Sequence, residues 1–142
     1  MSLTADALIR QWFNELWNQA REDTIDRLMA PQAAIHGLPS PDGQPLAGRE
    51  PFKALYRQFR SAFPNLTIQI GPVVSADGMA AAHCRAVGTH LGDGLGTPGT
   101  GKPVDFIGMV IIRVENGMIV EGWNCFDFLT CYQQIGLVPK LG

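Results

Sequence analysis

The spacing of apolar residues changes at Pro64, and this change constrains the fold more than any other feature of the sequence. Before Pro64, apolar residues recur at intervals of three and four, which is the pattern of helices with one buried face. After it, apolar and polar residues alternate, which is the pattern of strands. Helices followed by strands predict an α+β fold in which the helices cover one face of a strongly curved, mostly antiparallel sheet.

Three helices are predicted before Pro64. The first spans residues 4–20, and its apolar face contains Leu8, Ile9, Trp12, Phe13, Leu16 and Trp17. A short second helix is expected to start at Asp23, which can cap it, and to end at Pro31. The third starts at Pro51 and presents an apolar side made of Phe52, Leu55, Tyr56, Phe59 and Phe63. Residues 33–38 are expected to form a short strand, and 39–48 a loop.

Four strands are predicted after Pro64, over residues 66–74, 79–91, 104–115 and 118–128. The sequence Glu-Asn-Gly at 115–117 is typical of a tight hairpin turn between the last two strands. A much longer connection joins the second of these strands to the third. Connections of that length usually bind or cover a ligand, so we expect this one to act as a lid.

The long connection contains "GTPGTGKP" at 96–103, which differs by one residue from the phosphate-binding pattern GxxxxGK[ST]. Pro103 stands where the pattern needs a hydroxyl for Mg²⁺, and it has no N–H to offer a phosphate. The residues that follow predict a strand, whereas a phosphate loop leads into a helix. We therefore predict that this is not a nucleotide site and that Lys102 is solvated.

Composition limits the classes of function. A chain of 142 residues, 46% of them apolar, fits one domain, here taken as residues 1–142. A formal charge of −2 without a basic run predicts no nucleic-acid partner, and no apolar stretch is long enough for a membrane span. We expect a cytoplasmic protein. Cys84, Cys125 and Cys131 lack ligand spacing, which predicts reduced, buried thiols and no metal site.

Asp127 is the most informative polar residue of the last predicted strand, because it lies between Phe126 and Phe128. It either caps a following helix over residues 128–136 from an exposed position, or it is buried with a pKa raised by desolvation. The local sequence favours the cap. No Ser or Cys has the surroundings of an activated nucleophile, so covalent catalysis is not predicted.

Arg85 and His90 are candidates on one strand, but they have opposite parity. A flat strand cannot place both on the same face, and only a bulge near Gly88 could do so. His83 is expected at an exposed polar position, and His36 at the edge of the first strand.

The chain resembles the SnoaL-like polyketide cyclase (ester cyclase) family of the NTF2-like group. The features that carry the resemblance over nearly the whole chain are His36, Gly48-Arg49, "AFPNL" at 62–66, Arg85, Gly88-Thr89-His90, the turn 98–102, Arg113, Asn116-Gly117, Glu121-x-Trp123, Asp127 and Gln134-Ile135-Gly136. Asn65 departs from the family, whose members usually have Asp there. The resemblance implies a cone-shaped sheet that encloses a deep pocket closed by the N-terminal helices.

The resemblance also implies a mechanism. In characterised relatives an aspartate at the position of Asp127 is the general acid/base of an intramolecular aldol condensation, without cofactor or metal. Burial against aromatic residues such as Trp12 is then expected to raise the pKa of Asp127. His90, Arg85 or Asn124 is expected to donate a hydrogen bond to the enolate oxygen. A homodimer or homotetramer is the expected assembly.

The expected substrate is a small, polyketide-like carbonyl compound. The residues expected to contact it are Trp123, Asn124, His36, Trp12, Tyr56 and Phe106. Two other classes of function stay open at this point, because fold alone does not determine function. The first is a dehydratase or isomerase that acts α to a carbonyl, and the second is a non-catalytic module for small-molecule binding or dimerisation.

Overall fold

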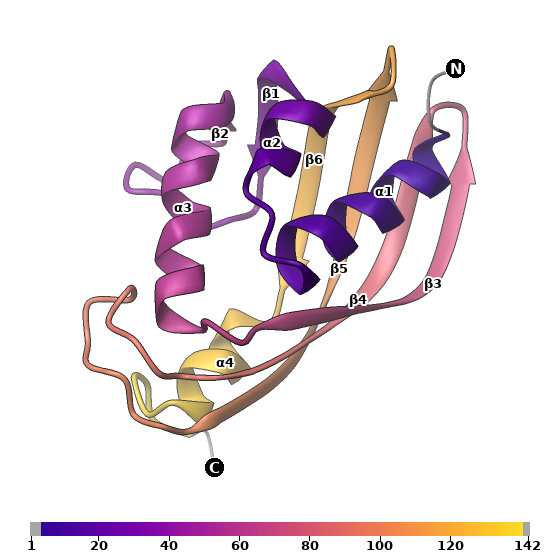
Figure 1. Cartoon of the computed structure of the whole chain (residues 1–142). Helices are drawn as coiled ribbons and strands as arrows, with labels where there is room; N and C mark the ends of the chain where they lie inside the picture. The colour runs from indigo at the N-terminus through magenta and orange to yellow at the C-terminus, as the bar shows by residue number, and fades with distance from the viewer. Residues whose placement is uncertain (1–3, 141–142) are drawn as a thin grey trace.

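The computed structural model describes residues 4–140, which form an α+β fold with helices on one side of a curved sheet (Figure 1). The helices are α1 (Ala5–Phe13), the π-helix η1 (Asn14–Asn18), α2 (Asp23–Leu28), α3 (Arg49–Ala62) and α4 (Phe128–Gln134). The strands are β1 (Met29–His36), β2 (Leu46–Ala47), β3 (Thr67–Ala76), β4 (Met79–Thr89), β5 (Pro103–Glu115) and β6 (Met118–Phe126). The predicted fold class is therefore confirmed.

The six strands lie in the order β2-β1-β6-β5-β4-β3, so β2 and β3 are the edges of an open sheet. Neighbouring strands are antiparallel, except that β1 runs parallel to β6. All four strands predicted after Pro64 are present. No helix within residues 4–140 is long and apolar enough to cross a bilayer.

Several predicted boundaries differ from the structure by a few residues. The second helix ends at Leu28 instead of Pro31, because Met29 already has the extended backbone of β1. The short strand β2 lies within the predicted loop 39–48. The last strand ends at Phe126, since Asp127 caps α4.

The first helix contains a π-helical turn that its apolar spacing does not reveal. Thr4 caps α1 by accepting a hydrogen bond from the Ala7 N–H at 3.1 Å. In η1 the Gln19 N–H donates to the Asn14 carbonyl, five residues back, at 2.9 Å. The Asn18 side chain then makes two hydrogen bonds with the backbone of Ile68 on β3: it donates to the carbonyl at 3.0 Å and accepts from the N–H at 2.7 Å. This turn therefore attaches the helix to the edge of the sheet.

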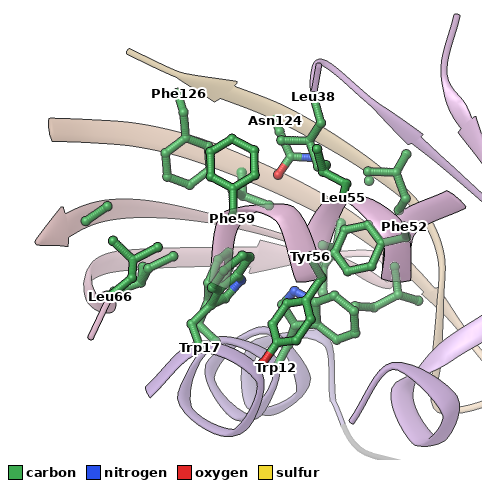
Figure 2. A pocket seen from close by; sticks show the side chains of 18 of the residues that line it. Trp12, Trp17, Leu38, Phe52, Leu55, Tyr56, Phe59, Leu66, Asn124 and Phe126 are labelled. Carbon is green, nitrogen blue, oxygen red and sulfur yellow. The ribbon is translucent and has the colours of Figure 1, made fainter. Parts of the chain in front are cut away.

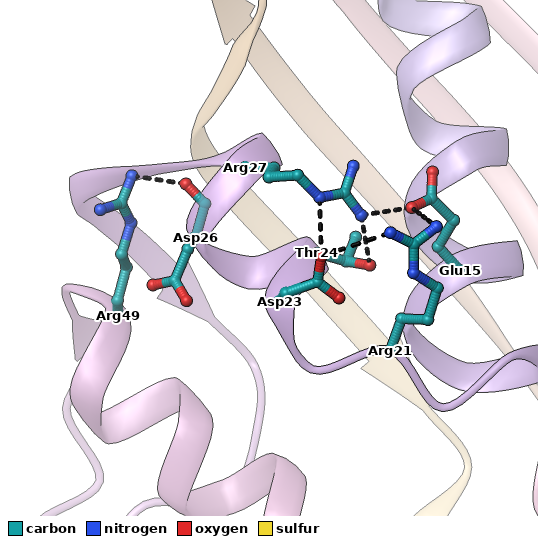
Figure 3. Close-up of polar contacts among 7 residues, drawn as sticks. All are labelled: Glu15, Arg21, Asp23, Thr24, Asp26, Arg27 and Arg49. Atoms are coloured by element: carbon teal, nitrogen blue, oxygen red, sulfur yellow. Dashed lines mark hydrogen bonds and ion pairs between the residues drawn. The ribbon is translucent and has the colours of Figure 1, made fainter.

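A network of charges joins η1 to α2 (Figure 3). Glu15 is buried and pairs with Arg27 and, at 3.1 Å, with Arg21, while Asp23 pairs with the same two arginines. Burial on its own raises the pKa of Glu15, but the hydrogen bonds from Arg27 and Gln11 and the two arginine charges together hold the pKa below its ordinary value. Glu15 thus remains ionised in the folded protein.

The sheet separates its residues into a buried concave face and an outer convex face. On β5, Val104, Phe106, Val110 and Ile112 are buried against the helices. The alternate residues Ile107, Met109 and Ile111 are 52%, 51% and 41% exposed on the outer face. The prediction of three buried thiols is wrong for Cys125, which is exposed on this outer face.

The other two thiols, Cys84 and Cys131, are free and buried as predicted. Desolvation raises their pKa to about 12, and Asp127 adds to the effect at Cys131. Both thiols are therefore protonated at neutral pH and contribute to packing rather than to nucleophilic chemistry.

Candidate functional site

A pocket lies between the concave face of the sheet and the helices α1, η1 and α3 (Figure 2). The space open to the centre of a water-sized sphere is about 80 Å³. By that measure one water needs roughly 15 Å³, so the pocket has room for a small ring system. The walls consist of Trp12, Phe13, Trp17, Met29, Ile35, Leu38, Phe52, Leu55, Tyr56, Phe59, Leu66, Ile68, Ala86, Phe106, Val110, Ile112, Ile119, Gly122, Asn124, Phe126 and Phe128.

Aromatic rings packed on one another form much of the wall. Trp12 contacts Phe52 with ring centroids 5.5 Å apart, and Trp17 contacts Tyr56 at 4.9 Å. The Tyr56 hydroxyl donates to the Leu16 carbonyl at 2.8 Å, which fixes the ring, and desolvation raises its pKa. The pocket is therefore walled by side chains that are already held in place.

Two small residues keep the floor of the pocket open. Ala86 on β4 and Gly122 on β6 both line it. Of the alanines of β4, Ala80, Ala82 and Ala86 are buried on the concave side, but only Ala86 reaches the pocket. Gly108 does not line the pocket, but it affects the position of a residue that does. A Cβ on Gly108 would lie 2.3 Å from the ring of Phe126. Gly108 therefore allows Phe126 to lie flat against the sheet.

Among the described residues of the wall, Asn124 supplies the one side-chain amide. It shares its strand face with Gly122 and Phe126, which also line the pocket. Its Nδ2 donates to the His36 carbonyl at 3.1 Å. Within the described residues, Tyr56 is the only lining side chain that can ionise. The lining side chains of residues 4–140 thus offer hydrogen-bonding groups but no carboxylate, imidazole or amine.

Asp127 lies outside this wall, and the expectation that it is buried with a raised pKa is wrong. Its carboxylate is exposed and caps α4, accepting from the Thr130 hydroxyl at 2.6 Å and from the Thr130 N–H at 3.0 Å. The hydroxyl bond is the main cause, and the backbone bond the second, of a pKa below the ordinary aspartate value. The cap that the local sequence favours is confirmed. The two flanking phenylalanines line the pocket while Asp127 turns away from it.

Arg85 and His90 lie on opposite faces of the sheet, as their parity requires. The pairing of β4 with β5 continues without a shift through Gly88, so the bulge that could have united them is not formed. Arg85 is exposed on the outer face, where its Nε donates to Asp105 at 2.8 Å. The hydrogen bond to that carboxylate, helped by its charge, raises the pKa of Arg85.

His90 is completely buried on the concave side but does not line the pocket. Its Nδ1 accepts from the Thr100 N–H at 3.2 Å and lies 3.0 Å from the Thr100 hydroxyl. The backbone of His90 also pairs with Lys102 and Gly101. His90 therefore holds both ends of the 91–102 connection together.

That connection does not cover the pocket. None of residues 91–102 belongs to the wall, and the Leu91 N–H donates to the Ala62 carbonyl at the end of α3 at 3.0 Å. The expected lid is thus a brace on the end of α3. Lys102 is exposed, and Pro103 begins β5, in agreement with the rejected nucleotide site.

Of the six residues expected to contact substrate, Trp12, Tyr56, Phe106 and Asn124 line the pocket, whereas His36 and Trp123 do not. The last two stack on each other, with ring centroids 5.5 Å apart and planes at 10°. His36 Nε2 lies 2.8 Å from Glu121, whose pKa is held down mainly by this contact. His36 also lines a second, more open hollow that shares Leu38 and Phe128 with the pocket.

Several wall residues were not predicted, among them Ile35, Leu38, Ala86 and Phe128. The alternation along β4 places Ala86 on one face of the strand together with Ala80 and Ala82. It does not show which of the two faces is the concave one that borders the pocket. Among residues 4–140, no three His, Cys, Asp or Glu side chains are grouped as metal ligands.

Comparison with known proteins agrees with this architecture. The family model for SnoaL-like polyketide cyclases matches residues 7–135, whereas a search of curated proteins gives no match. Two similar solved structures are described as "putative polyketide cyclase". IdmH from Streptomyces antibioticus is 30% identical, with a TM-score of 0.81 over 94% of this chain and 99% of its own. A Bacillus cereus protein is 29% identical, with a TM-score of 0.75 over 91% of this chain and 78% of its own.

A third structure shows only that the fold is shared. AclR from Streptomyces galilaeus, described as "a putative hydroxylase", is 20% identical and has a TM-score of 0.83 over 97% of this chain and 84% of its own. The same fold therefore occurs with differently described activities. With a family match over residues 7–135 and this NTF2-like architecture, the chain belongs to the SnoaL-like polyketide cyclase family.

Proposed function

We propose that the chain binds a small, polyketide-like carbonyl compound in the aromatic pocket and promotes an intramolecular aldol-type ring closure. The observation that carries the proposal is a preformed apolar cavity whose described wall contains a single side-chain amide. A largely apolar pocket with few, well-placed polar groups is the usual form of a site for a small organic ligand.

The reaction begins when a proton of a methylene between two carbonyls moves to one of the carbonyl oxygens, which gives the enol. The enol carbon then bonds to a second carbonyl carbon of the same molecule while the enol C–O re-forms a carbonyl and releases its proton. The oxygen of the attacked carbonyl gains a proton to become a hydroxyl, so that the product is an isomer of the substrate. The contribution of the protein is to hold the flexible chain folded, with the reacting carbons in contact and water excluded. Holding two groups in this way can correspond to effective concentrations of about 10⁵ M or more.

This form of catalysis places little demand on ionisable side chains. The resemblance assigns acid/base chemistry to Asp127, but that carboxylate is exposed, is held by Thr130 and has a lowered pKa. A carboxylate with a lowered pKa is a weaker base. In our proposal the β-dicarbonyl group enolises by itself, since it is already acidic, and the pocket selects the folded conformation.

The proposal is tested by product analysis with a matched pair of variants on β4. A linear poly-β-carbonyl compound is incubated with the protein, and the ring-closed isomer is measured by chromatography and mass spectrometry. Ala86→Leu fills the pocket, whereas Ala81→Leu makes the same change on the outer face of the strand. We expect at least tenfold slower ring closure for Ala86→Leu and an unchanged rate for Ala81→Leu. Equal rates in both variants would show that the pocket is not the site.

The role of Asp127 is tested separately with Asp127→Asn, which preserves the cap because Asn also caps helices well. If ring closure depends on conformation alone, the variant keeps the wild-type rate. A loss of a hundredfold or more in a variant that unfolds at the wild-type temperature would establish Asp127 as the acid/base and refute this part of the proposal.

One observation favours a second candidate, which is binding without catalysis. Apart from Tyr56, no side chain in the described wall can exchange a proton with the ligand. In that case the protein binds the linear compound and the closed ring, and the linear compound is recovered unchanged. The same product analysis therefore separates the two candidates.

A further inference from the structure

The polar character of the pocket depends on how the amide of Asn124 is oriented. The two ends of an amide look alike, and only their hydrogen-bond partners distinguish the acceptor from the donor. Here one end lies 3.1 Å from the His36 carbonyl, which can only accept. That end must be the nitrogen, because an oxygen there would face a second oxygen without a proton between them.

The opposite end of the amide is directed into the pocket. Figure 2 shows Asn124 Oδ1 pointing into the space beside Phe59 and Leu55, while the nitrogen points towards the strand that carries His36. Within residues 4–140, no group donates a hydrogen bond to this oxygen. The oxygen is also not one of the buried polar atoms that lack a partner, so it is accessible. Asn124 therefore offers an accessible hydrogen-bond acceptor to whatever occupies the pocket.

The backbone fixes this orientation. β1 pairs with β6 in parallel up to His36 and Trp123, and Gly37 then follows with φ +84°. A Cβ on Gly37 would lie 1.9 Å from the backbone oxygen of Asn124, so only glycine permits the chain to pass this close. The close approach is what brings the His36 carbonyl within reach of the amide nitrogen. The acceptor in the pocket is thus built by the strand pairing and does not depend on a free rotamer.

We propose that Asn124 makes this pocket selective for ligands that present a neutral hydroxyl group, enolic or phenolic, to its Oδ1. The inference rests on the proposed function and names the form of substrate that the site recognises. A ketone oxygen has no proton to donate to Asn124. A phenolate or enolate places a negative charge against the amide oxygen, and no described lining residue is a cation that could compensate it.

This assignment reverses the expectation that Asn124 donates a hydrogen bond to an enolate. An acceptor stabilises the enol instead, and the enol carbon is the nucleophile of the proposed ring closure. Asn124 then acts by favouring the reactive tautomer of the bound compound.

The experiment compares two bicyclic compounds of nearly equal size. The first, 7-hydroxycoumarin, is a phenol that ionises close to neutral pH, and the second, 7-methylcoumarin, has a methyl group in place of the hydroxyl. Their affinities are measured by titration calorimetry at pH 6 for the wild type and for Asn124→Leu. One neutral hydrogen bond predicts about fivefold tighter binding of the hydroxyl compound to the wild type. We expect equal affinity of the two compounds for Asn124→Leu.

A pH series on the wild-type protein makes the test independent of any variant. The affinity for 7-hydroxycoumarin is expected to fall as the pH rises through the ionisation of its own hydroxyl, while the affinity for 7-methylcoumarin stays constant. An affinity that rises with ionisation would mean that Asn124 presents its N–H to the ligand, and it would overturn the assignment.

Two further outcomes separate this inference from the proposed function. If the wild type binds both compounds equally, and Ala86→Leu binds neither, the pocket is a ligand site but the hydroxyl selectivity is wrong. If the wild type binds neither compound, the inference is overturned together with the ligand-binding premise of the proposed function.

Discussion

Substitution of Asn18 measures how much the attachment of the π-helical turn to the sheet contributes to the free energy of unfolding. The Asn18 side chain makes two hydrogen bonds with the backbone of Ile68, at 3.0 and 2.7 Å, and Ile68 is only 4% exposed. β3 is an edge strand, so these backbone groups have no neighbouring strand on that side. Asn18→Ala therefore removes a partner that the sheet cannot replace.

The magnitude follows from the two bonds. Each contributes about 1 kcal/mol net, so we expect Asn18→Ala to lower the free energy of unfolding by about 2 kcal/mol. For a domain of this size, each kcal/mol shifts the melting temperature by about 2–4 °C, which predicts a decrease of about 4–8 °C. Asn14→Ala is the matched control, because Asn14 is exposed in the same turn and its side chain makes no hydrogen bond within residues 4–140.

The assay is thermal and urea unfolding, followed by tryptophan fluorescence and circular dichroism. Both variants gain the same helix propensity, so the difference between them isolates the contacts with Ile68. Asn14→Ala is expected within about 0.5 kcal/mol of the wild type. Equal midpoints for the two variants would refute the reasoning, since they would mean that water satisfies the backbone of Ile68 as well as Asn18 does.

Four further outcomes are expected. Gly108→Ala forces the ring of Phe126 out of its place, which lowers stability by about 1–3 kcal/mol and weakens ligand binding in the same titration. Asp127→Ala removes the cap of α4 and lowers the unfolding free energy by about 1 kcal/mol, whereas Asp127→Asn retains it. Met109 is exposed on the apolar outer face, and Met109→Glu is expected to convert the homodimer implied by the resemblance into a monomer, as measured by light scattering. A wild-type protein that is already monomeric would contradict this prediction. Folding lowers the pKa of Glu15 from 4.5, so the ionised carboxylate stabilises the fold above pH 4.5, and this stabilisation is lost as the pH falls through the lowered pKa of the folded protein. The urea midpoints of the wild type and Glu15→Gln should therefore converge in acid.

The general architecture could be predicted because it depends only on the spacing of apolar residues along the chain. The change at Pro64 separates helices from strands, and the long strands β4, β5 and β6 followed from a two-residue period and from residues typical of strands. The aromatic face of the first helix also predicted Trp12 as a wall residue. The π-turn at 14–18 could not be predicted in this way, since one extra residue in a turn leaves the spacing of apolar residues nearly unchanged.

The errors at the site have a common physical origin. Alternation correctly grouped Trp123 apart from Asn124, but it does not say which group faces the helices, and that depends on the direction in which the whole sheet curves. For Asp127, the local sequence favoured the helix cap that the structure has, and the expectation of burial came from the family resemblance. Its two phenylalanine neighbours do line the pocket, yet the strand ends between them and the intervening residue turns outward to cap α4.

The absence of charge from the described wall has a consequence for mechanism. An ionised carboxylate placed among these aromatic rings would be destabilised by desolvation unless a partner compensated it, so its pKa would rise until it was neutral. An amide such as Asn124 offers an acceptor without that penalty and at any pH. In our proposal, such a pocket distinguishes tautomers of a neutral ligand without an ionised side chain that removes a proton from it. The acidity that the proposed ring closure needs then resides in the substrate, which is the property that a methylene between two carbonyls provides.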